Sequence, residues 1–182
     1  MNTFFTSDTH FSHANIIKYC NRPFANAKEM NMTMIENWNS VVKEDDVVWH
    51  LGDFAFSKFD TEFKILTSTL NGKINLVVGN HDKYLLKRKH LWSLFNRVYV
   101  LPYHEEKING RDFTFCHYAM RVWNKSHFGA YHLYGHSHST LEDLENSLSF
   151  DCGVDANNFT PLSSEQVEEK MSHKKPVLIE RN

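Results

Sequence analysis

Residues 74–82 read INLVVGNHD, an apolar run that stops at Gly79 and continues into three polar residues. A short apolar run bounded by glycine is typical of a buried strand, because both faces of such a strand are covered. Asn80, His81 and Asp82 follow where that strand would end. The stretch therefore predicts a strand over residues 74–78 that leads into a polar loop.

The same arrangement recurs along the chain. Short apolar stretches come before four further polar motifs: Asp8-Thr9-His10, Gly52-Asp53, His117 and Gly135-His136-Ser137-His138. In an α/β fold, the ends of strands bring residues from distant parts of the chain together on rigid supports. We therefore expect the five motifs to meet at one site, within a single α/β domain that spans residues 1–182.

Apolar periodicity and turn residues predict the remaining elements. Helices are expected at residues 15–20, 28–42, 61–70 and 83–95, with a last helix after the capping residues 163–166. Strands are expected at residues 3–7, 47–51, 97–107, 112–117, 131–134, 148–154 and 176–180. Asn109-Gly110, between two of these strands, is the residue pair that a type I′ hairpin turn prefers.

The helix expected at residues 28–42 carries apolar residues at intervals of three and four, which places them on one face. They are Met30, Met34, Ile35, Trp38, Val41 and Val42. We expect this face to pack against the core.

The charge balance of the chain is close to neutral. Lys and Arg number 20 and Asp and Glu number 22, a net charge of −2, which argues against a domain-wide surface for nucleic acid or membranes. The basic run at residues 87–90 is interpreted as a solvated helix face, with a phosphate contact as the alternative. Three widely spaced cysteines favour a reducing compartment. With no secretory signal and no apolar stretch of membrane-spanning length, we expect a cytoplasmic protein without a membrane partner.

The five motifs contain a set of metal ligands. Asp8 and His10 lie two residues apart, so both side chains leave an extended segment on the same face. His136 and His138 repeat this spacing, and Asp53 is expected to bridge two ions through both carboxylate oxygens. Asn80 and His117 complete a second ligand set. Imidazole, carboxylate and amide ligands suit Mn²⁺, Fe or Zn²⁺ better than Ca²⁺.

On these motifs, from Asp8 to His138, the chain resembles the calcineurin-like metallophosphoesterase superfamily, in particular its small single-domain bacterial and phage-type members. The resemblance implies a four-layer αββα sandwich with two divalent transition-metal ions, manganese favoured over iron, nickel or zinc. It assigns the first ion to Asp8, His10, Asp53 and His138. It assigns the second ion to Asp53, Asn80, His117 and His136.

The resemblance also implies a mechanism. A hydroxide that bridges the two metals at Asp53 would attack phosphorus, since metal-bound water ionises near a pKa of ~7, and His81 would assist the leaving group. In the protein-phosphatase branch of the family, the motif GDxxDRG carries an aspartate that orients this histidine. Here Phe56 stands in that place, and Asp82 is the candidate for the orienting role.

Three further residues are candidates for contacts to phosphate: His13, Arg22 and Arg121. The alternatives are a helix cap for His13 and structural ion pairs for the two arginines. We expect the substrate to be a small or nucleotide-like phosphodiester, because the chain has no extended basic, aromatic-interleaved stretch for a long nucleic acid. The alternatives are a phosphomonoesterase that uses the same site, and a catalytically silent scaffold of the same fold.

Overall fold

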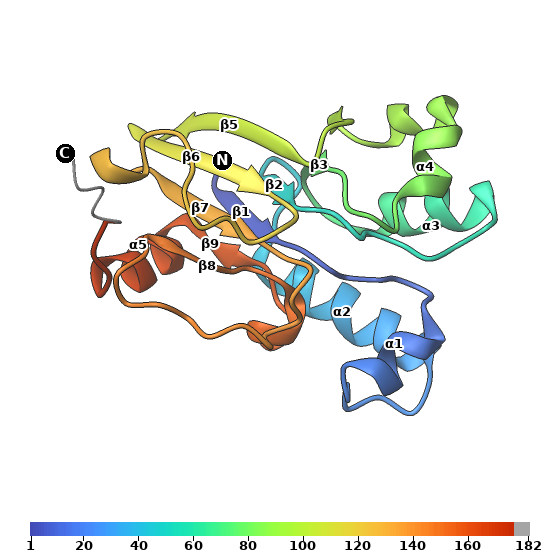
Figure 1. The fold of residues 1–182 in the computed structure, drawn as a ribbon. Coiled ribbons are helices and arrows are strands. Elements are labelled where there is room, and N and C mark those ends of the chain that lie inside the picture. The colour runs from blue at the N-terminus through green and yellow to red at the C-terminus, as the bar shows by residue number, and fades with distance from the viewer. Residues whose placement is uncertain (177–182) are drawn as a thin grey trace.

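The computed structural model describes residues 1–176 and consists of two β-sheets packed face to face and flanked by helices (Figure 1). The first sheet has the order β4-β3-β2-β1-β9. Its strands are β1 (Thr3–Thr6), β2 (Val47–His50), β3 (Lys73–Val77), β4 (Arg97–Tyr99) and β9 (Leu162–Ser163). The second sheet has the order β5-β6-β7-β8, with β5 (Tyr103–Ile108), β6 (Arg111–Cys116), β7 (Tyr131–Tyr134) and β8 (Ser149–Asp151). The predicted α/β sandwich is confirmed.

Most strands of both sheets run parallel to one another. Strands β1 to β4 pair in parallel, and only β9 is antiparallel to its neighbour β1. In the second sheet, β6, β7 and β8 are parallel and β5 forms an antiparallel hairpin with β6. The carboxyl ends of the parallel strands therefore lie at one edge of each sheet, where the polar motifs follow them.

The helices on the outer face of the first sheet are α1 (Ala14–Tyr19), α2 (Ala27–Val41), α3 (Asp60–Thr69) and α4 (Lys83–Lys87). Neighbouring residues of a strand point to opposite faces, so Phe4 joins the cluster under these helices while Phe5 joins the cluster between the sheets. From α2, Met30 and Trp38 are buried against Phe4, as expected, but Val41 is 37% exposed. The prediction that Val41 is buried was wrong. Helix α2 ends at Val41, and the extended backbone of the next residue, Val42, turns inward.

The last helix, α5 (Ser164–Ser172), begins with the predicted capping box, in which Ser163 and Gln166 bond each other's backbone N–H groups. Its buried Val167 and Met171 join the cluster between the two sheets. None of the helices in residues 1–176 is long and apolar enough to cross a membrane. The strand expected at residues 176–180 falls, beyond Pro176, outside the described residues.

Three predicted elements differ from the structure. The helix expected at 83–95 breaks at Arg88 (φ −119°, ψ 71°) into α4 and a 3₁₀ turn, Lys89–Leu94, and the Arg88 side chain lies over the Tyr84 ring at 4.1 Å. The strand expected at 97–107 is divided between the two sheets, because Pro102 lacks the N–H group that a ladder needs. The strand expected at 148–154 is shortened to β8 by a 3₁₀ turn at Val154–Ala156. The predicted Asn109-Gly110 turn is confirmed, with φ of 50° and 83°.

His132 on β7 is a fully buried structural histidine. Its Nδ1 donates to the Thr114 carbonyl at 3.0 Å and its Nε2 accepts the Met120 N–H at 3.1 Å. Burial lowers the pKa of His132 to about 4, from 6.5. Between pH 6.5 and about 4, His132 is therefore protonated in the unfolded chain but neutral in the folded chain. The folded state is destabilised relative to the unfolded state as the pH falls through this range.

We expect the free energy of unfolding to fall by about 3 kcal/mol between pH 6.5 and 4 on account of His132. Urea unfolding at a series of pH values measures this slope. The variant His132→Gln should be less stable at pH 7. Its free energy of unfolding should nevertheless depend less steeply on pH, by the equivalent of one bound proton. Parallel slopes for the two proteins would show that His132 is not the group responsible.

Candidate metal centre

The loops after β1, β2 and β3 lie next to one another and hold the first three motifs. Asp8 N–H donates to the Gly52 carbonyl at 3.0 Å, and His10 N–H donates to the Asp53 carbonyl at 2.9 Å. The second sheet is tied to this edge by His136, whose N–H donates to Asp8 Oδ2 at 2.9 Å. The structure thereby brings together all seven residues that the sequence suggested as ligands: Asp8, His10, Asp53, Asn80, His117, His136 and His138.

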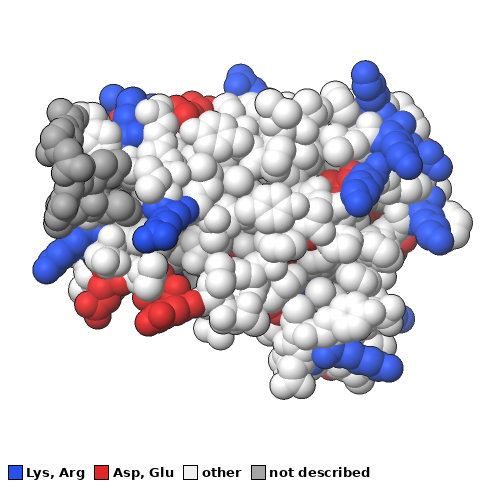
Figure 2. All heavy atoms as spheres, viewed as in Figure 1, with Lys and Arg blue, Asp and Glu red and all other residues white. Residues whose placement is uncertain are grey.

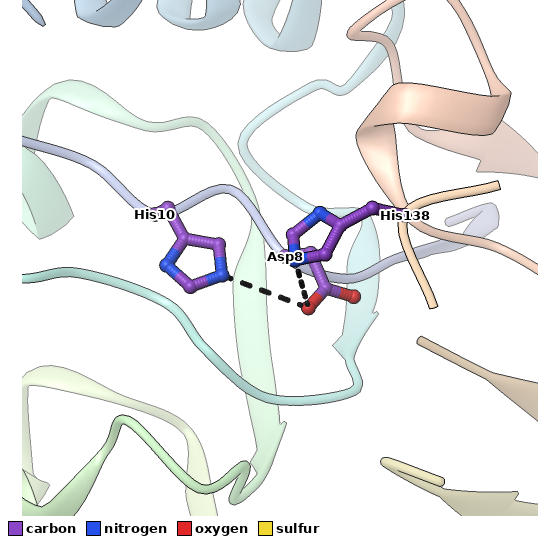
Figure 3. A group of neighbouring side chains, drawn as sticks. All are labelled: Asp8, His10 and His138. Atoms are coloured by element: carbon purple, nitrogen blue, oxygen red, sulfur yellow. Dashed lines mark ion pairs between the residues drawn. The ribbon is translucent and has the colours of Figure 1, made fainter. Parts of the chain in front are cut away.

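One group of donors consists of Asp8, His10 and His138 (Figure 3). The two imidazoles approach one carboxylate oxygen, Asp8 Oδ1, with His10 Nε2 at 3.8 Å and His138 Nε2 at 3.9 Å. The other nitrogen of His138, Nδ1, bonds the carboxylate of Asp155 at 2.7 Å. That bond fixes the orientation of the ring, so that Nε2 faces the group.

A second group consists of Asp53, His117 and His136. His117 Nε2 lies 3.4 Å from Asp53 Oδ2 and 3.0 Å from Asn80 Oδ1. Its Nδ1 lies 2.8 Å from the Leu51 carbonyl, which can only accept a hydrogen bond, so Nδ1 is the donor and Nε2 faces the group.

Asp53 connects the two groups. Its Oδ2 lies 3.5 Å from His10 Nε2 in the first group and 3.4 Å from His117 Nε2 in the second. Its Oδ1 accepts the His81 N–H at 2.7 Å. The arrangement differs from the expected bridge through both oxygens, because one oxygen alone faces both groups.

The donor set fits bound cations. Asp8 Oδ1 and His10 Nε2 are buried and have no hydrogen-bond partner among the described residues, although a buried polar group without a partner is costly. Metal–ligand bonds of ~2.0–2.2 Å place two ligands of one ion roughly 3–4 Å apart, and the separations around Asp8 and Asp53 fall in that range. Both orphaned atoms would gain a partner if a cation lay between them.

The electrostatics of the centre point the same way. Burial opposes ionisation of Asp53, yet the hydrogen bond and charge of His117 lower the pKa of Asp53 to about 2. Burial also opposes protonation of His117, but Asp53 and the charge of Asp8 raise the pKa of His117 to about 9. Burial lowers the pKa of His10 to about 2, which keeps this imidazole neutral and able to bind a metal. The two carboxylates thus favour positive charge at this point.

The backbone of the centre is strained. Five of the seven residues adopt positive φ angles, from 46° to 66°: Asp8, His10, Asp53, His136 and His138. Such angles are uncommon outside glycine and concentrate at functional sites. The motif glycines allow the loops to approach, since a Cβ on Gly79 would lie 2.3 Å from Asp53 Oδ1 and one on Gly135 would lie 2.1 Å from Asp8 Oδ2.

We expect Gly79→Ala to lose ~1–3 kcal/mol of stability through overpacking and to weaken metal binding by ~10–100-fold, because Asp53 must move. The added Cβ also meets the backbone nitrogen of Asp53 at 2.7 Å, which a side-chain rotation cannot relieve. Titration with Mn²⁺ measures the affinity. Gly110→Ala is the control, because Gly110 has a φ of 83° but no atom within 4 Å of the new Cβ. Equal metal affinity in the two variants would contradict the prediction.

His81 and Asp82 have different surroundings. His81 is exposed at the site, and its ring centroid lies 5.4 Å from that of His10. Asp82 is buried, and its carboxylate accepts the N–H groups of Asp53, Phe54 and Gly79 at 2.8, 3.0 and 2.8 Å. The prediction that Asp82 orients the His81 ring was wrong, because both its oxygens are engaged in joining the β2 and β3 loops.

The three candidates for contacts to phosphate differ in their distance from the metal centre and in their partners. His13 is buried beside the centre, with its Nδ1 3.2 Å from His10 Nδ1, and it makes no capping bond to α1. Arg22 is buried in an ion pair with Asp155, so the structural alternative holds for it and a phosphate clamp does not. Arg121 is exposed and lines a cavity that the seven residues do not share.

Sequence reasoning missed Asp155, which holds both Arg22 and His138. Its neighbours Val154 and Ala156 form no motif, so nothing in the local sequence marks it. Thr9 and His50 were also missed. The His50 Nε2 lies 2.9 Å from Thr9 Oγ1 behind the β1 loop.

Comparison with known proteins agrees with this centre. The sequence profile of the calcineurin-like phosphoesterase superfamily domain matches residues 1–151. An uncharacterised protein of Methanocaldococcus jannaschii is 38% identical over 163 residues, 86% of this chain and 84% of that protein. The gene 66 protein of Mycobacterium phage L5 is 36% identical over 83 residues, 44% of this chain and 40% of that protein.

Among solved structures, a protein of unknown function from Aquifex aeolicus has the same fold, with a TM-score of 0.72 and 23% identity over 93% of this chain and 98% of that one. The profile covers all five motifs, from Asp8 to His138. The chain therefore belongs to the calcineurin-like phosphoesterase superfamily, a family of metal-dependent phosphoesterases.

Proposed function

We propose that the protein is a dinuclear metal-dependent phosphoesterase that hydrolyses small or nucleotide-like phosphodiesters. The observation that carries the proposal is the position of Asp53 Oδ2, which faces both groups of donors at 3.4–3.5 Å. Asp8, His10 and His138 would hold one ion, and Asn80, His117 and His136 the other, with Asp53 between them. Manganese is the favoured metal, with iron, nickel and zinc as alternatives.

Two bound cations would neutralise charge on the phosphoryl oxygens and lower the pKa of water to ~7. The protein's own residues position the metal ligands and contact the substrate. The Asp53 backbone is held by Asp82, and His138 is held by Asp155, so the ligands are positioned before substrate arrives. His13 lies beside His10 at the wall of the site, where it can contact a phosphoryl oxygen.

His81 is the proposed general acid. Its ring is exposed at the site, while its backbone N–H is fixed to Asp53 Oδ1 at 2.7 Å. A water oxygen forms the new bond to phosphorus, the ester P–O bond breaks, and the leaving oxygen takes its proton from the His81 imidazole. The attacking water loses one proton to solvent and His81 regains one from solvent, so the reaction consumes one water for each ester bond. General-acid catalysis of this kind contributes ~10²–10⁴-fold.

We expect the protein to favour diesters over monoesters. The cavities on both sides of His81 leave room for two ester groups. The deciding measurement is kcat/KM for bis(p-nitrophenyl) phosphate and a 2′,3′-cyclic nucleotide, against p-nitrophenyl phosphate and a nucleoside monophosphate. Mn²⁺, Ni²⁺, Mg²⁺ and Zn²⁺ should each be supplied. Diesters should turn over faster, and faster hydrolysis of both monoesters with every metal would favour a phosphomonoesterase instead.

A further inference from the structure

Two cavities meet at His81. One, of about 580 Å³, is lined by His10, Asp53, His136 and His138, four of the seven candidate ligands. The other, of about 570 Å³, lies between the loop at 55–59 and helices α3 and α4, and Asn80 is also in its lining. His81 lines both cavities. The second cavity, here named the leaving-group cavity, therefore adjoins the proposed catalytic site at His81.

The leaving-group cavity offers free aromatic surface. Phe59 is 69% exposed and Phe56 is 48% exposed. The Phe56 ring stacks on His13 at 4.2 Å and meets the His81 ring at 5.8 Å in an edge contact, and about half of the side chain remains exposed. Tyr84 also lines the cavity, but its ring already lies between Phe63 and Arg88. Exposed aromatic rings of this kind bind nucleobases by stacking, at ~1–3 kcal/mol for each base.

The same cavity is basic. Lys58, Lys83 and Lys87 line it and are all exposed. The lysine ion pairs within residues 1–176 are made by other lysines, so these three ammonium groups keep their charge free for a ligand. Glu62 is the one carboxylate in the lining, and it is engaged by the hydroxyls of Ser12 and Ser57. Figure 2 shows basic side chains gathered at the end of the molecule where Figure 1 places α3 and α4.

We propose that the leaving-group cavity binds the leaving group of the substrate, and that this group is a nucleoside that carries an additional phosphate. The proposal rests on the proposed phosphodiesterase function. Because His81 gives its proton to the leaving oxygen, the leaving group must lie beside His81, and the leaving-group cavity offers it space there. In that cavity Phe56 and Phe59 can stack a base, while the lysines attract a phosphate that the reaction does not cleave. The substrate class is then a short phosphorylated oligonucleotide or a related nucleotide diester.

The test uses the full-length, Mn²⁺-loaded protein and three dinucleotides: TpT, pTpT and TpTp. Identification of the products shows which nucleoside leaves. We expect kcat/KM to be about tenfold higher when the extra phosphate is on the leaving nucleoside than for TpT. The variant Lys83→Ala/Lys87→Ala should remove this preference, so that its kcat/KM no longer depends on the extra phosphate. Lys43→Ala/Lys64→Ala makes the same charge change outside the cavity and should keep the preference.

Stacking is tested separately. Phe59→Ala should raise KM for the dinucleotides about tenfold, Phe59→Trp should restore it, and Phe128→Ala should have no effect, since Phe128 is 74% exposed and outside both cavities. The inference is overturned if the extra phosphate gives no preference, if the preference survives in Lys83→Ala/Lys87→Ala, or if Phe59→Ala behaves like Phe128→Ala. Hydrolysis of bis(p-nitrophenyl) phosphate without any dinucleotide cleavage would also overturn it. No hydrolysis of any ester would instead contradict the proposed function.

Discussion

Asp53→Ala is expected to abolish phosphoesterase activity, with a loss of at least ~10³-fold, and to reduce metal binding. The reason is the position of Asp53 Oδ2 at 3.5 Å from His10 Nε2 and 3.4 Å from His117 Nε2, between the two donor groups. Without this oxygen neither ion keeps its shared ligand, and charge stabilisation by metals is worth several kcal/mol. Elemental analysis of protein reconstituted with Mn²⁺ should give two ions per wild-type chain and fewer in the variant.

Asp45→Ala is the matched control for this substitution. The Asp45 side chain is 92% exposed, and within residues 1–176 its one ion pair is a surface pair with Lys73 at 3.8 Å. It should leave both the metal content and the activity unchanged. A wild-type protein that saturates with one metal ion per chain would contradict the dinuclear assignment, whatever the activity of Asp53→Ala.

His81→Ala should keep both metals and lose activity according to the leaving group. With an alkoxide leaving group we expect a loss of ~10²–10⁴-fold, because alkoxides depart poorly without a proton. With nitrophenolate, which departs unprotonated, the loss should be much smaller. The measurement is kcat/KM for alkyl and nitrophenyl diesters, together with the metal content of each protein.

The control for this prediction is His127→Ala, which removes an exposed histidine outside both cavities at His81. Equal losses in His81→Ala on alkyl and nitrophenyl esters would indicate that His81 stabilises charge in the transition state instead of donating a proton. Loss of metal from His81→Ala would remove its assignment as a residue that acts beside the ions.

Much of the fold was predictable from local patterns. The apolar runs before Asp8, Asp53 and Gly79 are the strands β1, β2 and β3, because a strand covered on both faces needs a continuous apolar sequence. The capping box at Ser163 and the Asn109-Gly110 turn were also predictable, since each depends on neighbouring residues. The organisation of residues 1–182 as a single domain stays a prediction.

Errors in the predictions had local and distant causes. The strand expected at 97–107 is interrupted by Pro102 within the segment itself, whereas Arg88, where the helix expected at 83–95 breaks, pairs with the distant Asp60 at 3.1 Å. Asp82 resembles an active-site carboxylate in the motif GNHD, but its bonds go to the backbone of the β2 loop. Periodicity within a short window carries no information about Asp60 as a partner of Arg88 or about the β2 loop as the partner of Asp82.

The metal centre, like the fold, was predictable in part from the sequence. The residue types and their order along the chain were enough to propose the seven candidate ligands, because the chemistry of a hard or borderline cation restricts the choice of side chains. The role of His81 was instead implied by the resemblance to the family. The tertiary structure alone decided that one oxygen of Asp53 faces both groups, that Asp155 holds His138 and that Arg22 is buried in an ion pair. These features depend on distances between residues up to 133 positions apart in the chain. Such distances are set by how the two sheets and their loops pack, which no local stretch of sequence records.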